Sequence, residues 1–290
     1  MTAPRLSLLA LALTAALPVM AQEAQPKDRS QLDTEVITAE RREENIKDVP
    51  SAVTKLSGEK LDVLASGGQD IRFLSGRVPS LNIESSFGRA FPRFYIRGYG
   101  NTDFRLNASQ PVSVVMDDVV QENPILKGFP IFDTSAVEVL AGPQGTLFGR
   151  NTPAGVVKFD SVKPSQKQDG YASITVGNYG TLNLEGAANL PLTGDWAARI
   201  SAQSQRRSDW VDNTAPGAAT PKTEGYRDTA VRAQVLYEPH KQFSALANVH
   251  VRDLDGSPRL FRANAIKRGT NDLADGFSTD TVAFNGVNEQ

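Results

Sequence analysis

Two glycine-rich segments are the places where this chain comes nearest to a phosphate-binding loop. Residues 98–103 lack the third glycine of a dinucleotide-binding motif. Residues 142–152 have an arginine where a Walker loop needs lysine, and their spacing also differs from that motif. The chain has no cysteine and two histidines, which excludes thiol catalysis and thiolate metal sites and disfavours histidine-based triads. The sequence therefore predicts a protein that is not an enzyme, with no cofactor and no metal.

Composition and charge narrow the class of protein further. The 290 residues are 40% hydrophobic and 22% charged, which is enough apolar content for a folded core. A length of roughly 150 residues per domain suggests about two domains. The 31 Lys and Arg residues nearly balance the 33 Asp and Glu residues, for a net charge of −2. No basic excess is available to follow a phosphate backbone, so nucleic-acid binding is not expected.

Residues 1–21 have the pattern of an export signal. Arg5 precedes an apolar run over residues 6–17, and small residues stand at Val19 and Ala21. The run is about half as long as a membrane-spanning helix needs to be. We expect a signal peptide that is cleaved between Ala21 and Gln22, and the alternative is a buried N-terminal helix. The sequence thus predicts export from the cytoplasm.

A flexible tether is predicted over residues 22–45, because residues 22–31 are polar and offer nothing to bury. Within the tether, residues 32–39 contain several residues that favour β-strands, and we call them the strip. Such a strip can add as a strand to the open edge of another protein's sheet, with main-chain hydrogen bonds supplying the affinity. The alternative is an ordinary first strand of the following domain.

Residues 46–165 are predicted to form one domain with both helices and strands, which we call the α+β domain. Ser57 is expected to cap a helix that carries Leu61 and Leu64 and ends near residues 67–68. A second short helical stretch is expected at residues 70–74. Strands bounded by Gly, Pro, Asn and Asp are predicted over residues 81–84, 94–97, 112–116, 137–140 and 155–159. The connections over residues 85–93 and 98–110 are long enough to suggest a function of their own.

From residue 168 to residue 290 the pattern changes to strands in which apolar and polar residues alternate. About five such runs of roughly ten residues are predicted, at residues 171–176, 182–190, 196–203, 231–237 and 243–252. Their charge is confined to one face, as in a membrane β-barrel, although an exported soluble β-sandwich has the same period. The connections at residues 177–180, 192–195 and 238–241 are short, and those at residues 206–226 and from residue 253 are long and polar. If the first strand rises from the periplasm, both long connections lie outside and the turns at 192–195 and 238–241 lie inside, which favours a barrel. His250 is expected to point into the lumen.

Four motifs in chain order resemble those of TonB-dependent outer-membrane receptors. Residues 94–98 resemble the family's Ile-Arg-Gly strand, and residues 112–119 its valine-rich strand, with Asp118 in place of the usual glycine. Residues 132–157 resemble the family's most recognisable stretch, which is nearly complete in this chain. The strip resembles the TonB box, which implies this role for Leu32, Asp33, Thr34, Glu35, Val36, Ile37, Thr38 and Ala39. The implied fold is an α+β plug domain followed by the first strands of an antiparallel transmembrane β-barrel, incomplete here because the family has 22 strands.

The resemblance also implies how the parts work together. Arg97 and Arg150 match two plug arginines that pair with barrel glutamates and lock the plug, and the alternative is two solvated arginines. The implied activity is uptake of a scarce nutrient across the outer membrane of a Gram-negative bacterium, with TonB, ExbB and ExbD as periplasmic partners and outer-membrane lipid around the barrel. The chain is expected to be the front part of such a receptor and not to transport alone. A porin-like passive channel and an exported β-rich binding protein are the alternatives.

The expected cargo is a ferric siderophore, which is the family's commonest ligand, with haem, cobalamin, nickel and oligosaccharides as alternatives. The chain offers aromatic faces and cations to an anionic chelate in and beside the two long connections of the α+β domain. The ligand candidates are Phe87, Arg89, Phe91, Arg105 and Asn107. The alternative is that most of the aromatic rings in this stretch pack in the domain core.

Overall fold

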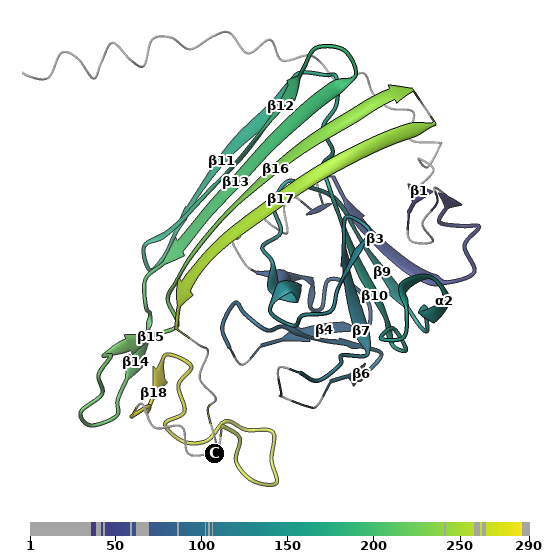
Figure 1. Ribbon diagram of the computed structural model, residues 1–290. Coiled ribbons are helices and arrows are strands. Elements are labelled where there is room, and N and C mark those ends of the chain that lie inside the picture. The colour runs from purple at the N-terminus through teal and green to yellow at the C-terminus, as the bar shows by residue number, and fades with distance from the viewer. Residues whose placement is uncertain are drawn as a thin grey trace, which may run out of the picture. The chain divides into compact units, whose positions relative to one another are not determined.

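The computed structural model describes residues 36–38, 42, 44–58, 60–61, 70–85, 87–101, 103, 105, 107–240, 242–257, 262 and 265–285 (Figure 1). The predicted cleavage site at residues 21–22 and strip residues 32–35 and 39 lie outside this part of the chain. All described residues belong to one compact unit. In the part that is described, no helix is long and apolar enough to cross a membrane.

The α+β domain is built on a five-stranded sheet. Its strands are β3 (Ala52–Ser57), β7 (Val112–Met116), β8 (Val119–Gln121), β9 (Thr134–Ala141) and β10 (Gly155–Ser161), in the spatial order β3-β9-β10-β7-β8. Only the β10–β7 pair is parallel, and the other neighbours run antiparallel. The sequence predicted three of these strands, with β7 at its observed bounds and β9 and β10 two to four residues shorter than observed.

The two faces of this sheet are buried by different parts of the chain, because successive side chains of a strand point to opposite faces. One face, with Val137, Val139 and Val157, forms the main core with η1 (Ile71–Leu74), β4 (Leu81–Glu84) and β5 (Arg93–Ile96). The other face carries Leu140 and Val156 and is covered by Ile37, Val49 and Phe148. Ile37 belongs to the strip, so the described part of the strip contributes to covering the second face.

The predicted helix cap at Ser57 is wrong. Ser57 is the last residue of β3, which pairs with β9 over six residues, and the helical residues Lys60 and Leu61 come only after it. Long-range pairing with β9 therefore overrides the local capping signal. The predicted short helix at residues 70–74 is η1, whose backbone Arg72 N–H bonds to the Asp70 side chain. β4 matches its prediction, and β5 pairs with β4 and with β6 (Tyr99–Gly100).

The second half of the chain forms a single antiparallel sheet of long strands, which we call the long sheet (Figure 1). Its strands follow chain order and are β11 (Asp169–Gly177), β12 (Thr181–Pro191), β13 (Trp196–Arg207), β16 (Tyr226–His240) and β17 (Phe243–Gly256). All five predicted runs are present, and each strand extends beyond its predicted bounds.

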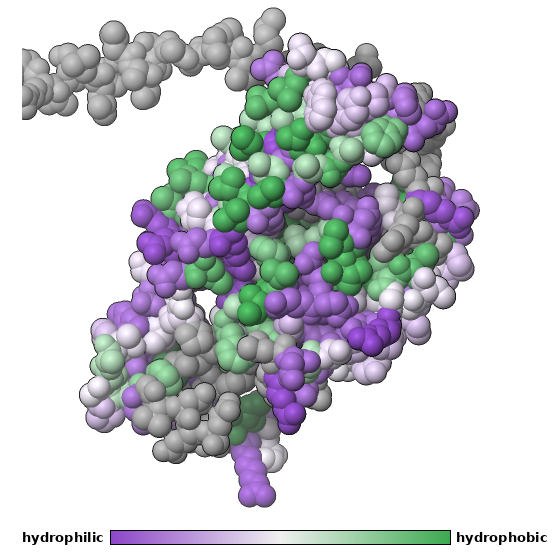
Figure 2. Space-filling view, in the orientation of Figure 1, coloured by the Kyte–Doolittle hydropathy of each residue, from purple (hydrophilic) through white to green (hydrophobic). Residues whose placement is uncertain are grey.

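The long sheet is apolar on its exposed face and polar on its buried face. Ile200, Val231 and Val251 are 45–63% exposed, whereas Arg199 and Arg232 are at most 3% exposed. Hydrophobic side chains crowd the surface over these strands in Figure 2. A soluble β-sandwich has the opposite arrangement, since its apolar faces meet in the core. The exposed apolar face therefore fits a sheet whose outer surroundings are lipid.

The two long polar connections of the second half join in a small sheet. β14 (Val211–Asn213) pairs with β15 (Lys222–Thr223) and in parallel with β18 (Thr281–Val282). The Asn213 side chain also donates a hydrogen bond to the Phe284 carbonyl oxygen at 2.8 Å. The sequence predicted long polar loops here and did not predict that they pair with each other. At the other end of the molecule, β1 (Val36–Ile37) pairs with β2 (Glu44–Asn45).

Candidate functional site: the interface between the α+β domain and the long sheet

A carboxylate of the α+β domain is held between two arginines of the long sheet. Asp133, which lies just before β9, accepts hydrogen bonds from Arg199 Nε at 2.8 Å and Arg199 Nη2 at 2.5 Å. Arg232 Nη2 donates to the Asp133 backbone oxygen at 2.7 Å and lies 3.5 Å from the carboxylate. All three side chains are at most 4% exposed. We call this group the Asp133 cluster.

In a second cluster the carboxylate comes from the long sheet and one of its arginine partners comes from the α+β domain. Asp228 of the long sheet accepts from Arg89 Nε of the α+β domain at 2.9 Å and from both Arg252 Nε and Nη2 at 2.8 Å. Arg89 also donates to Gln205 and lies with its guanidinium 4.1 Å from the centre of the Tyr226 ring. Arg252 Nη1 donates to the Gly128 carbonyl oxygen of the α+β domain at 2.8 Å. We call this group the Asp228 cluster.

The two clusters fix the α+β domain to three neighbouring strands of the long sheet, β13, β16 and β17. A further bond joins Asn248 Nδ2 on β17 to Asp117 at 3.0 Å. On the next strand, β12, Glu185 accepts from the Asp133 N–H at 3.3 Å. Buried ion pairs repay their desolvation only when geometry and additional hydrogen bonds are good, and removing one partner leaves an unpaired buried charge. These contacts therefore specify one position of the domain against the sheet.

The sequence confines the charge of these strands to one face, and Arg199, Arg232 and Arg252 are on that face, but the pattern gives them no partners. The available signal was the presence of charge on alternate positions of strands whose other face is apolar. Asp133 and Arg199 are separated by 66 residues, and Arg89 and Asp228 by 139. Pairings over such distances follow from the fold and not from local spacing.

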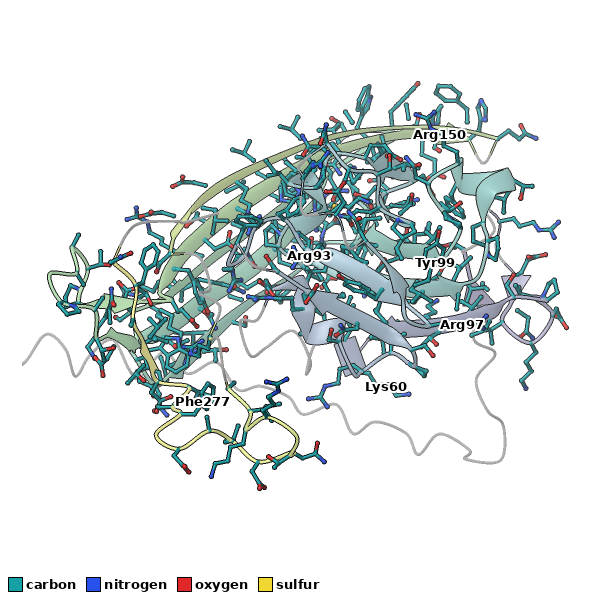
Figure 3. All side chains as sticks on the ribbon, turned by 90° about the horizontal axis from the view of Figure 1, so that it is seen from below. Lys60, Arg93, Arg97, Tyr99, Arg150 and Phe277 are labelled. Atoms are coloured by element: carbon teal, nitrogen blue, oxygen red, sulfur yellow. The ribbon has the colours of Figure 1, made fainter. Side chains whose placement is uncertain are left out.

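The predicted lock residues Arg97 and Arg150 are exposed and come from separate elements, as Figure 3 shows. Arg97 lies in the turn after β5 with a φ of 54°, and Arg150 lies in the turn after α2 (Gly145–Phe148). Neither arginine forms an ion pair with another residue that the structure describes. The lock through these two residues stays a prediction.

The five ligand candidates divide into two groups. Phe91 is 1% exposed and Arg89 belongs to the Asp228 cluster, so neither offers a free surface. Phe87 is 48% exposed and meets the Phe91 ring edge-on at 5.6 Å. Arg105 and Asn107 are also exposed. A role in ligand binding stays a prediction for all five, and Phe87, Arg105 and Asn107 have the accessibility that it needs.

The described part of the strip, Val36 to Thr38, is docked on the α+β domain. Ile37 is fully buried, and the Thr38 N–H donates to both oxygens of Glu138 at 3.0 and 3.1 Å. The Thr38 hydroxyl donates to Asp160 at 3.2 Å and accepts from Lys158 Nζ at 2.9 Å. The Lys55 ammonium donates to the Val36 carbonyl oxygen.

The docking site is a charged row that crosses three strands. Lys55 on β3, Glu138 on β9 and Lys158 on β10 are direct partners in the strand register. They line a pocket of about 630 Å³ together with Thr38 and Asp160. Burial raises the pKa of Glu138 above its usual range, and the Thr38 N–H and the two lysines oppose that rise. The site holds the strip by both an apolar contact and a hydrogen-bonded carboxylate.

A buried lysine lies in η2 (Leu126–Gly128), beside the carbonyl group that Arg252 contacts. Lys127 is 2% exposed and donates to the Val112 carbonyl oxygen at 3.1 Å. Burial lowers the pKa of Lys127 to about 8. Within the described part of the chain, no group of three His, Asp or Glu side chains is arranged to hold a metal ion.

Comparison with known proteins identifies the α+β domain. Residues 45–156 match the TonB-dependent Receptor Plug Domain family. The vitamin B12 transporter BtuB of Vibrio vulnificus is 28% identical over 179 residues, which cover 59% of this chain and 27% of BtuB.

Two solved structures share the fold. The ferric yersiniabactin uptake receptor FyuA of Yersinia pestis has a TM-score of 0.59 at 22% identity, over 66% of this chain and 29% of FyuA. The pyoverdine receptor FpvA of Pseudomonas aeruginosa has a TM-score of 0.60 at 16% identity, over 78% of this chain and 31% of FpvA. The chain therefore spans less than a third of the length of these relatives.

Proposed function

Since this chain belongs to the TonB-dependent receptors, with a plug domain and strands of a barrel wall, we propose that it serves active nutrient uptake across the outer membrane. The observation that carries the proposal is the pair of buried charge clusters at Asp133 and Asp228. They hold the α+β domain against the polar face of the long sheet. A passive pore needs that face to be open to water, as in porins. A held domain instead suits a gate that opens only when work is done on it.

The proposed energy-coupling partner is TonB, acting with ExbB and ExbD from the periplasm. The strip is the proposed contact, because an extended segment can add to a sheet edge through its main chain. In the structure, Val36 and Ile37 already pair with β2, and Ile37 is buried. Strand addition to TonB therefore requires this pairing and the Thr38–Glu138 contact to break first.

A ferric siderophore is the proposed cargo. FyuA is a ferric yersiniabactin uptake receptor, FpvA was solved with bound pyoverdine, and BtuB is a vitamin B12 transporter. Exposed Phe87 and Arg105 on the α+β domain could offer an aromatic face and a cation to an anionic chelate. Haem, cobalamin, nickel complexes and oligosaccharides are the alternative cargoes.

The test is uptake by iron-starved cells that express the receptor from its complete reading frame. Val36→Pro removes a main-chain donor from the strip and is expected to abolish energised uptake while cargo still binds at the cell surface. Val36→Thr keeps the β-branched shape and the main-chain donor, so it is the matched control. Uptake that persists in Val36→Pro would indicate a passive channel. Growth on separate ferric siderophores, haem and cobalamin identifies the cargo class.

A further inference from the structure

The exposed face of the long sheet has an aromatic pair at one end. Trp196 on β13 and Tyr237 on β16 are direct cross-strand partners with their rings stacked at 4.5 Å. From there toward the other end, the partners on the same face are Ala198 with Val235, Ile200 with Ala233, and Ala202 with Val231. This face is therefore an apolar band that begins at an aromatic pair.

The band ends at a pair of arginines. Past Ser204 and Thr229, the next partners on the exposed face are Arg206 and Arg227. Both are exposed, and like charges directly opposite each other on a sheet repel. Arg227 lies 3.4 Å from Asp255 on β17, with both side chains at least 65% exposed. No acidic side chain that the structure describes forms an ion pair with Arg206.

The distance between the aromatic pair and the arginine pair matches the height of the apolar band of an outer-membrane barrel. Trp196 and Arg206 are ten residues apart on one strand, which is about 33 Å at roughly 3.3 Å per residue. At a strand tilt of about 40° this corresponds to about 25 Å along the membrane normal, the height of the apolar band of outer-membrane barrels. The aromatic pair then lies at one interface and the arginine pair at the other.

The arginine pair lies at the interface where the long connections leave the sheet. Arg206 is the next-to-last residue of β13 and Arg227 the second residue of β16, so they flank the connection that contains β14 and β15. Long connections lie on the external side of outer-membrane barrels. Given the outer-membrane location of the proposed function, the pair faces the head groups of the outer leaflet.

We propose that Arg206 and Arg227 form a binding site for a phosphate group of an outer-leaflet lipid. A phosphate between the two guanidinium groups replaces their mutual repulsion with charge-assisted hydrogen bonds. Two planar guanidinium groups suit this ligand better than ammonium groups, because each can donate two parallel hydrogen bonds. Asp253 and Asp255 on β17 are the carboxylates on the same face, and only Asp255 pairs with an arginine of the site.

The test is retention of lipid by the complete receptor purified from outer membranes into detergent. The probes are lipid A with both phosphates, dephosphorylated lipid A and inorganic phosphate. Arg206→Gln with Arg227→Gln is expected to lower retention of phosphorylated lipid A about ten-fold or more, since charged hydrogen bonds are lost. The double change to lysine is expected to lose less. Arg268→Gln removes an exposed arginine beyond the long sheet and is the matched control, with no change expected.

Several results would overturn the site. These are equal retention by the wild type and the double glutamine variant, equal retention of both forms of lipid A, or displacement of the lipid by millimolar inorganic phosphate. If the glutamine variant loses phosphorylated lipid A and the lysine variant retains it fully, the site is supported. That result would also show that the positive charge of the pair matters more for binding than the geometry of the guanidinium groups. Binding is measured without TonB or cargo, so failure of this site leaves the proposed uptake function standing, and failure of uptake leaves the site standing.

Discussion

The α+β domain and the long sheet place the apolar side chains of their strands on opposite sides of the protein surface, buried in the first and exposed in the second. In the α+β domain, Val137, Val139 and Val157 point into the main core. In the long sheet, Ile200 and Val231 point outward, while the alternate positions carry buried arginines and glutamines. In both regions the apolar side chains lie on the side of the strand that excludes water. The contrast teaches that apolar residues mark the water-poor side of a strand, which in the long sheet is the outside.

The two regions also differ in what holds them. The α+β domain is held by an apolar cluster on each face of its sheet, and this stabilisation is non-directional. Contact between the domain and the long sheet instead depends on a few directional charge pairs around Asp133 and Asp228. An interface of this kind fixes one position without joining the domain and the long sheet in one apolar core. Such a domain is suited to being held firmly and then moved as a unit.

The largest effect is expected from Asp133→Ala, which leaves Arg199 and Arg232 buried without their shared carboxylate. Breaking one partner of a buried pair costs about 3–5 kcal/mol of unfolding free energy. The urea midpoint of the purified receptor in detergent measures this loss. Asp195→Asn changes an exposed carboxylate in a turn of the long sheet and should leave the midpoint unchanged. If both variants unfold alike, the Asp133 cluster does not join the two regions.

Val231→Arg tests the lipid-facing side of the comparison. An arginine near the middle of the apolar band costs about 2–4 kcal/mol, and one near the interface about 0–1 kcal/mol. Thr229→Arg, two residues toward the arginine pair on the same face, is the matched control and should cost the smaller amount. Refolding into lipid vesicles at a series of urea concentrations measures both. Equal costs would mean that water and not lipid covers this face.

Lys127 makes the stability of the α+β domain depend on pH. The pKa of Lys127 is about 8 in the folded domain and 10.5 when the side chain is free. At pH values below 8 the buried lysine is charged, and burial of that charge lowers the free energy of unfolding. As pH rises from 8 to 10.5, the unfolded state holds more protons, and the free energy of unfolding should rise by up to about 3 kcal/mol. Hydrogen exchange of the β7 amides measures this rise. Lys127→Met should abolish the slope, and a slope that survives in the variant would assign it to another group.

The smallest effect concerns the strip. Thr38→Val removes the hydroxyl that bonds to Asp160 and Lys158 but keeps the N–H that bonds to Glu138. Losing such a hydrogen bond is worth about 1 kcal/mol, so protease cleavage in the strip should become about five-fold faster. Thr38→Ser retains the hydroxyl and serves as control. A cleavage rate that does not change in Thr38→Val would show that the hydroxyl is not needed, and that the Ile37 contact and the main-chain hydrogen bonds of Val36 and Thr38 hold the strip.

The local sequence predicts a strand well where the flanking residues also indicate where the strand begins or ends. β4 and β7 match their predicted bounds, since Pro79 lies just before β4, and Pro111 and Asp117 flank β7. Residues 52–57 were not predicted as a strand, because Ser57 gives a capping signal and only pairing with β9 selects the extended form. For the site, alternation indicated which arginines face inward. Which partners these arginines have depends on loops such as the turn at Asp133. Asp133 has a positive φ of 47°, which no local sequence pattern predicts.

The most direct test of the account is a nitroxide scan along β16, from Thr229 to Val235, in the complete receptor in lipid vesicles. The chain contains no cysteine, so each single cysteine adds one labelling site. Collision with oxygen, which concentrates in lipid, should be high at residues 231, 233 and 235 and low at residues 230, 232 and 234, which face the α+β domain. The reverse alternation, or equal values at all positions, would contradict the claim that the long sheet has lipid outside and the α+β domain inside.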